Sequence, residues 1–309
     1  MKRIITSATL LLLLAFGGAQ AQKKSKATPA PTPPPTLDLS NPTDAMKASR
    51  KITSSLKDGE SCFYYWTGNV FSRVPGEKDR LLFTYVAMNA RASATVLDEQ
   101  KGYGWRHVSR EVLFYQDPKT KEILKKWMNP WTNKEIDVVH IANDPVNGRG
   151  TSFSMGQDGK TPFKLAGFEK DGYWFQLNEV PLFYSNPLGG DYQEQIGGTY
   201  QAMEIFQTMT PMGELLDASK DKTENSLIAW SRVSKWLPWL DMGDRTGQMI
   251  FTGIGKKVKS FDDFPEELRN EIKANYPIYA TAPPTDDTRP NETSWTYYKK
   301  LMEKKKSGK

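Results

Sequence analysis

The sequence predicts a mainly β protein: a large antiparallel sheet, barrel-like or strongly curved, with one N-terminal helix and two C-terminal helices. Short runs rich in aromatic and β-branched residues recur between Cys62 and Lys257, as strands do. Short segments with Pro, Gly, Asn or Asp separate them, which favours antiparallel neighbours. Aromatic residues make up 12% of the chain and gather in these runs. We expect closure or strong curvature to shelter the rings and the strand edges.

The N-terminus has the pattern of a signal peptide. Lys2 and Arg3 precede an apolar run at positions 10–16, and an Ala-Gln-Ala cleavage pattern ends at Ala21. We therefore expect cleavage after Ala21 and a periplasmic or secreted protein. No later run reaches the roughly 18 apolar residues of a membrane-spanning helix, so no transmembrane segment is expected.

The Pro-rich segment 22–36 predicts an extended tether. Residues 37–309 are then expected to form a single β-rich domain with a basic C-terminal tail. Cys62 is the only cysteine, so no internal disulfide forms and stability depends on the core.

The positive charge of the chain lies at its ends. The total is +6, yet the N-terminal 21 residues carry two positive charges, the tether three, and residues 299–309 a net five. About −4 remains for the rest of the chain. A nucleic-acid-binding domain concentrates positive charge on a folded face, so nucleic acid is not an expected partner.

Three helices are expected. Asn41 and Pro42 open the first, as N-cap and first helical residue, and its apolar face ends near Leu56, before Asp58-Gly59. We expect this helix to pack against the sheet or to plug it. The two C-terminal helices are predicted at 262–276 and about 293–306.

Ten runs fit strands. They are 62–71, 81–87, 104–115, 122–128, 135–142, 163–168, 172–180, 199–210, 226–237 and 248–257.

The segment Val112–Val146 contains two Asp/Asn-Pro-x-Thr patterns, beginning at Asp117 and Asn129. Asp or Asn bonds the backbone at the first turn position, and Pro fixes φ for a type I turn. These turns predict an antiparallel meander across the segment.

Further motifs accompany these two turns: Leu56-Lys57-Asp58-Gly59-Glu60, Tyr65-Trp66-Thr67-Gly68, Pro75-Gly76-Glu77, and His140 with Asn143-Asp144-Pro145-Val146. Together they resemble an uncharacterised bacterial family of exported proteins, the domain of unknown function 1838. The resemblance covers residues 40–275 and implies no activity. Its pattern has Gly after each turn Thr, where this chain has Lys121 and Asn133.

Histidine is scarce, and both histidines are candidate acid–base residues. His140 and Asp144 share a side if the strand stays regular, so the carboxylate could orient the imidazole as a general base. The alternative is a core histidine beside an ordinary turn. Trp105 and His107 also share a face, and they either line a ligand pocket or pack in the core.

The sequence lacks the usual cofactor motifs. Two histidines without zinc spacing and one cysteine predict no metal site, although His107, His140 and Asp144 could join if their strands meet. No G-x-S-x-G or phosphate-binding pattern is present. We therefore expect no cofactor.

The aromatic residues give the leading functional hypothesis: an exported protein that binds a small hydrophobic or aromatic molecule in an aromatic-lined cavity. The first alternative is a cofactor-free lyase, isomerase or hydratase using His140, with Asp144 and His107. The second is an envelope protein that acts through partners. The apolar segment 236–240 is either a lid or a structural plug. The predicted ligand-binding residues are Trp66, Trp105, Trp127, Trp174 and Trp230.

Overall fold

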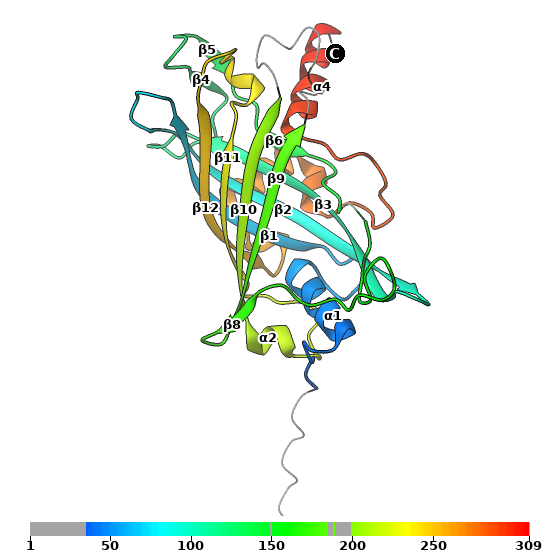
Figure 1. Ribbon diagram of the computed structural model, residues 1–309. Coiled ribbons are helices and arrows are strands. Elements are labelled where there is room, and N and C mark those ends of the chain that lie inside the picture. Colours follow the sequence, from blue (N-terminus) through cyan, green and yellow to red (C-terminus); the bar gives the residue numbers. More distant parts are fainter. Residues whose placement is uncertain (1–34, 149, 185–187, 189–198, 309) are drawn as a thin grey trace, which may run out of the picture. The chain divides into compact units, whose positions relative to one another are not determined.

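The computed structural model describes residues 35–308, except 149, 185–187 and 189–198. This part of the chain forms a ten-stranded sheet, a separate two-stranded sheet and four α-helices (Figure 1). Every strand pairing in it is antiparallel. The predicted mainly β class and large antiparallel sheet are therefore confirmed. The predicted signal peptide 1–21 and nearly all of the tether 22–36 lie outside the described residues.

The ten-stranded sheet is open. Its order is β6-β3-β2-β1-β12-β11-β10-β9-β8, with β7 beside β3. Among the described residues, β6 and β8 at the two ends do not pair with each other. The predicted closure into a barrel is therefore wrong. The edge strands β6, β7 and β8 have three residues or fewer, and such short edges limit unwanted pairing without closure.

The strands of this sheet are β1 Cys62–Arg73, β2 Arg80–Asp98, β3 Gly102–Gln116, β6 Ile141–Asn143, β7 Ser152–Phe153, β8 Phe168–Lys170, β9 Tyr173–Tyr184, β10 Tyr200–Pro211, β11 Leu227–Ser234 and β12 Gln248–Val258. The second sheet pairs β4 (Lys126–Met128) with β5 (Glu135–Asp137).

One face of the large sheet, here called the aromatic face, carries the side chains that alternate with those packed under α3 (Glu266–Asn275). Its rings come from several strands, because Trp66 on β1, Tyr85 on β2 and Trp230 on β11 are all buried on this side. Glycines make room for them. A Cβ on Gly253 would lie 2.0 Å from the hydroxyl oxygen of Tyr85, so only glycine fits there.

The opposite face is covered over β1, β2 and β3 by α3 (Glu266–Asn275) and the segments around it. Leu268 and Ile272 on α3 are fully buried against residues such as Met88 and Phe114. The amphipathic pattern of this helix therefore matches its burial, as predicted from the sequence.

The N-terminal helix α1 (Pro42–Thr53) begins as predicted. The side chain of Asn41 accepts hydrogen bonds from the backbone N–H groups of Thr43 and Asp44, at 2.9 and 3.2 Å. The helix ends before Leu56. It lies against one end of the aromatic face, where the Tyr64 hydroxyl donates to the Ile52 carbonyl at 2.6 Å.

Two buried lysines fasten this end of the molecule. Lys51 Nζ donates to the carbonyls of Glu214, Leu215 and Asp217 at the end of α2 (Met212–Leu216). Lys257 Nζ on β12 donates to carbonyls at the end of α1 (Figure 1 shows α1 beside α2). Because terminal helix carbonyls lack partners within their own helix, these ammonium groups satisfy both helix ends.

Other segments cover the far end of the aromatic face. Trp239, in the 3-10 helix η2 (Pro238–Leu240), packs on Phe83, Tyr115 and Trp127 with ring centroids 5.7, 5.4 and 6.3 Å away. Residues 236–240 are all buried, which favours the structural plug over the lid.

The last helix, α4 (Ser294–Lys306), packs here through buried Trp295. The basic tail is largely helical, and Lys305 pairs with Asp137 at 2.8 Å. The remaining 3-10 helices are η3 (Phe261–Asp263) and η4 (Pro277–Ala280).

Both predicted Asp/Asn-Pro turns are confirmed. Asp117 Oδ1 accepts from the N–H groups of residues 119 and 120, and Asn129 Oδ1 from those of residues 131 and 132. Lys121 and Asn133 have φ of 66° and 56°, the left-handed region for which the family pattern has glycine.

The predicted meander is only partly correct. Runs 122–128 and 135–142 contribute short strands, mostly in the separate sheet, because Leu124, Trp127 and Ile136 turn onto the end of the aromatic face.

Candidate functional site

The five predicted ligand-binding tryptophans do not form one group. Trp66 and Trp230 meet on the aromatic face, with ring centroids 6.4 Å apart. Trp127 packs against Phe83 at the covered end of that face. Trp105 lies on β3, where its indole N–H points at the Met46 sulfur, 3.1 Å away. Trp174 donates to the Ala166 carbonyl beside a separate apolar cluster.

Trp66 and Trp230 are the centre of a cluster of rings. Trp230 contacts Tyr85, Phe251 and Phe206, with centroids 6.0, 5.6 and 6.4 Å away. Among the residues that the structure describes, the Nε1 atoms of both tryptophans are buried without a hydrogen-bond partner, as are those of Trp239 and Trp295. Buried indole N–H groups usually find a partner, so these four are unusual.

A group of polar side chains lies next to these rings on the aromatic face. We call it the polar strip; it consists of Asn89 and Arg91 on β2, His107 and Glu111 on β3, and Asn143 on β6. The register explains the group, because Asn89 is opposite Glu111, which is opposite Asn143. Arg91 is opposite Ser109, and therefore lies diagonally between His107 and Glu111.

Burial changes the ionisation of the polar strip. Burial and the nearby Glu204 carboxylate raise the pKa of Glu111, whose Oε1 accepts a 2.9 Å hydrogen bond from Asn143. Burial lowers the pKa of Arg91, although a guanidinium stays charged in proteins. The Arg91 guanidinium lies 4.9 Å from the Tyr64 ring centroid. The strip therefore combines a cation with a carboxyl that is easier to protonate than usual.

His107 opens onto a pocket of about 350 Å³ at the edge of the sheet. Trp105 lines the same pocket, with Gly148, Gly150, Thr151, Ser152 and Gln157. Burial, assisted by the positive charge of Arg91, lowers the pKa of His107 to about 3, so the ring is neutral at physiological pH. Its Nε2 is buried without a partner. The predicted Trp105–His107 pair thus does line a pocket.

His140 is a satisfied histidine. Its Nδ1 accepts a hydrogen bond from the Tyr115 backbone N–H at 3.1 Å. The ring stacks on Tyr115 and meets the edge of Phe114. Burial lowers the pKa of His140 to about 4. These contacts match the alternative of a core histidine.

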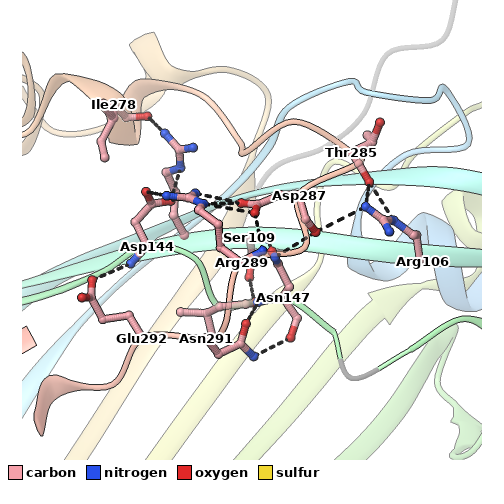
Figure 2. A network of polar contacts seen from close by, with 12 residues as sticks. Arg106, Ser109, Asp144, Asn147, Ile278, Thr285, Asp287, Arg289, Asn291 and Glu292 are labelled. Atoms are coloured by element: carbon pink, nitrogen blue, oxygen red, sulfur yellow. Dashed lines mark hydrogen bonds and ion pairs between the residues drawn. The ribbon is translucent and has the colours of Figure 1, made fainter. Parts of the chain in front are cut away.

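Asp144 pairs with arginines (Figure 2). Its carboxylate lies 3.0 Å from Arg110 Nε and 2.9 Å from Arg289 Nη1. The predicted orientation of His140 by Asp144 is therefore not formed, since the carboxylate is occupied by two cations. His140 contacts residue 114 of β3, seven residues from His107, which corresponds to about 23 Å along a strand. The three predicted catalytic residues thus do not converge.

The same network holds the segment between η4 and α4 against β3 (Figure 2). Arg289 pairs with Asp287 at 2.7 Å, and Arg106 donates to the carbonyl of Thr285 at 2.7 Å. Asn291 and Asn147 exchange hydrogen bonds at 2.7 and 2.8 Å. The network thus has a structural role: it fixes residues 285–291 to β3 and to the segment after β6.

We expect Asp144→Asn to lower the free energy of unfolding by about 2 kcal/mol, because Arg110 would become a buried charge with a weaker partner. Chemical unfolding measures this change. Asp137→Asn is the matched control, since its pair with Lys305 is exposed on both sides and should contribute under about 0.5 kcal/mol. Equal effects of the two variants would contradict the structural role of Asp144.

A second pocket, of about 620 Å³, lies at the far end of β1 and β11. It is lined by Arg73, Lys235, Trp236 and the loop 243–248, among others. The Trp236 indole N–H is satisfied there by the Arg245 carbonyl, at 2.9 Å. None of the predicted site residues lines this pocket, and no buried ring nitrogen points into it without a partner.

Within the described part of the chain, no group of three or more His, Cys, Asp or Glu residues is arranged to hold a metal ion. The search for membrane-crossing helices among the same residues found none with sufficient length and hydrophobicity.

A model of the family described as "Protein of unknown function (DUF1838)" matches residues 59–302. The chain belongs to this family. The resemblance inferred from the turn motifs is thereby confirmed, and the match spans the large sheet, the polar strip and most of α4. The family description carries no activity, so it leaves the role of the strip open.

A search of curated proteins gave no match. Among solved structures, the crystal structure of a LolA superfamily protein, NE2245 from Nitrosomonas europaea, is 9% identical, covers 73% of this chain and 96% of its own, and has a TM-score of 0.16. A TM-score this low does not indicate a common fold.

The sequence did not single out Arg91 or Glu111. Glu111 falls in the predicted strand 104–115, on the side opposite to Val112. Arg91 lies beyond residue 87, where the second predicted strand ended. Its signal was its spacing from Tyr85, three strand periods away on the same face.

Proposed function

We propose that this protein binds a small hydrophobic or aromatic molecule on the aromatic face of its sheet. Among the described residues, five buried ring nitrogens have no partner, and the three that support this most are Trp66 Nε1, Trp230 Nε1 and His107 Nε2; the other two, Trp239 Nε1 and Trp295 Nε1, lie at the covered end of the face. Trp66 on β1 and Trp230 on β11 lie close together, and His107 on β3 lies on the same side of the sheet, six residues along the strand from the level of Trp66. An unsatisfied buried polar atom costs roughly 1–3 kcal/mol, and a ligand or ordered water with acceptor atoms would remove that cost.

Curvature of the sheet supports a sheltered site. Four strands separate β3 from β10 in the sheet, which in a flat sheet corresponds to about 24 Å. Yet the carboxylate of Glu204 on β10 raises the pKa of Glu111 on β3. Such mutual influence favours a sheet that bends around the aromatic face, leaving a ligand enclosed by rings from both sides.

The chemical character of the face also fits a small-molecule site. Such sites combine apolar and aromatic walls with a few polar groups that orient the ligand. Here Trp66, Trp230 and Phe251 supply the wall, and the polar strip supplies the orienting groups. The enzyme built on His140, Asp144 and His107 is less favoured, because the three side chains are occupied or far apart. We propose further that the chain is exported, on the evidence of residues 1–21.

Tryptophan fluorescence tests the proposal. Titration with neutral aromatics, sterols and long-chain alcohols is expected to change the emission for at least one class, with saturation. Trp66→Phe and Trp230→Phe keep a ring but remove an N–H group, so each should weaken binding of an acceptor-bearing ligand about tenfold.

Trp174→Phe is the matched control, because its N–H already donates to Ala166. Unchanged emission with every class would reject the binding function. Equal losses in all three variants would reject the aromatic face as its location.

A further inference from the structure

The Arg91 guanidinium has no anionic partner of its own. Among the residues that the structure describes, no hydrogen bond or ion pair involves it, and its Nε is buried without a partner. The other arginine on this face differs, because Arg232 pairs with Glu204 at 2.9 Å and donates to Tyr200. Of these two arginines, one is thus paired with a carboxylate and the other is not.

The Glu111 carboxyl attracts the charge of Arg91, but the two form no ion pair in the described part of the chain. Glu111 is diagonal to it across β2 and β3, but its Oε1 is bonded to Asn143. Burial and Glu204 also raise the pKa of Glu111, which reduces its negative charge. A half-buried guanidinium without a counterion is unfavourable for folding, so its presence points to an external anion.

The surroundings of Arg91 restrict the anion to a small group with an apolar body. The Arg91 guanidinium lies over the Tyr64 ring, and this cation–π contact holds the guanidinium group in place. In the same direction along β1, Trp66 begins the ring cluster, four residues or about 13 Å beyond Cys62, which is the register partner of Arg91. A planar carboxylate matches the bidentate geometry of a guanidinium.

We propose that the ligand is an amphipathic carboxylate, its charged end paired with Arg91 and its apolar end against Trp66 and Trp230. This inference rests on the proposed binding function and adds the class of ligand. His107 and Asn89 lie beside the charged end, where the unpartnered His107 Nε2 and Asn89 Oδ1 are further polar contacts.

Matched probe pairs test the class. Dodecanoate is compared with 1-dodecanol, and 1-naphthylacetate with 1-naphthylacetamide, by tryptophan fluorescence and calorimetry on the full mature chain. We expect the wild type to bind the acid of at least one pair ten times or more tightly than its neutral analogue. Arg91→Met should remove that preference, whereas Arg91→Lys should keep part of it. Arg73→Met, at the other pocket, is the control that should change nothing.

The stability of Arg91→Met separates a binding role from a structural one. Removing an unpaired charge should leave the midpoint of urea unfolding unchanged or raise it, whereas a structural arginine would lower it. Equal affinity for acid and neutral probes, or a lowered midpoint with loss of both, would overturn the carboxylate assignment. If no probe of either kind binds, the proposed binding function itself fails.

Discussion

Lys257→Met is expected to lower the free energy of unfolding by about 4 kcal/mol, measured by urea unfolding. Lys257 Nζ donates to the backbone carbonyls of Lys51 and Ser54, at 2.8 and 2.7 Å, and the residue is only 2% exposed. Methionine fills the space but donates nothing, so buried carbonyls at the end of α1 lose their partner. Lys256→Met is the matched control: its neighbouring side chain is exposed and should change stability by under about 0.5 kcal/mol.

The pH dependence of this difference has a definite sign. Burial lowers the pKa of Lys257 to about 8 in the folded protein, below its ordinary value in the unfolded chain. Between these two values the unfolded state binds more protons, so this group makes the folded state more stable as pH rises. The stability of the wild type relative to Lys257→Met should therefore increase from pH 8 to pH 10. A constant or shrinking difference would contradict burial of a charged Lys257.

Trp239→Ala is expected to lower the free energy of unfolding by about 4 kcal/mol. The ring is 5% exposed and contacts Phe83, Tyr115 and Trp127, so its removal leaves a cavity at the covered end of the aromatic face. Phe183→Ala is the control, because that ring is 73% exposed. A small loss of stability together with faster ligand entry would instead make residues 236–240 a lid.

Local chemistry made much of this fold predictable. The Asn41 cap, the turns at Asp117 and Asn129, and the left-handed residues after them all depend on neighbours within four positions. Such signals are complete in the sequence. Closure of the sheet depends instead on whether β6 and β8 meet, which no local pattern records.

The candidate site was less predictable for a related reason. Strand β2 continues to Asp98 through residues 89–94, a run of alanine and polar residues that lacks the usual strand formers. Those residues fit because Ser93 accepts a hydrogen bond from Arg50 of α1, a partner 43 residues away. Tertiary contact therefore overrides propensity there and brings Arg91 onto the aromatic face.

The expected pairing of His140 with Asp144 failed on one assumption. Alternation along a strand requires regular backbone, but β6 begins only at Ile141. His140 precedes the strand and Asp144 follows it, so their side chains are set by different neighbours, Tyr115 for the first and Arg110 for the second.

The contacts between Lys257 and the end of α1 also have a consequence for the order in which the chain folds during synthesis. The helix emerges from the ribosome early, but its terminal carbonyls are bonded by a side chain 206 residues further along the chain. Until Lys257 has been translated, the carbonyls at the C-terminal end of α1 lack the hydrogen bonds that its ammonium group donates. A growing chain therefore completes its native N-terminal contacts only when most of the polypeptide exists.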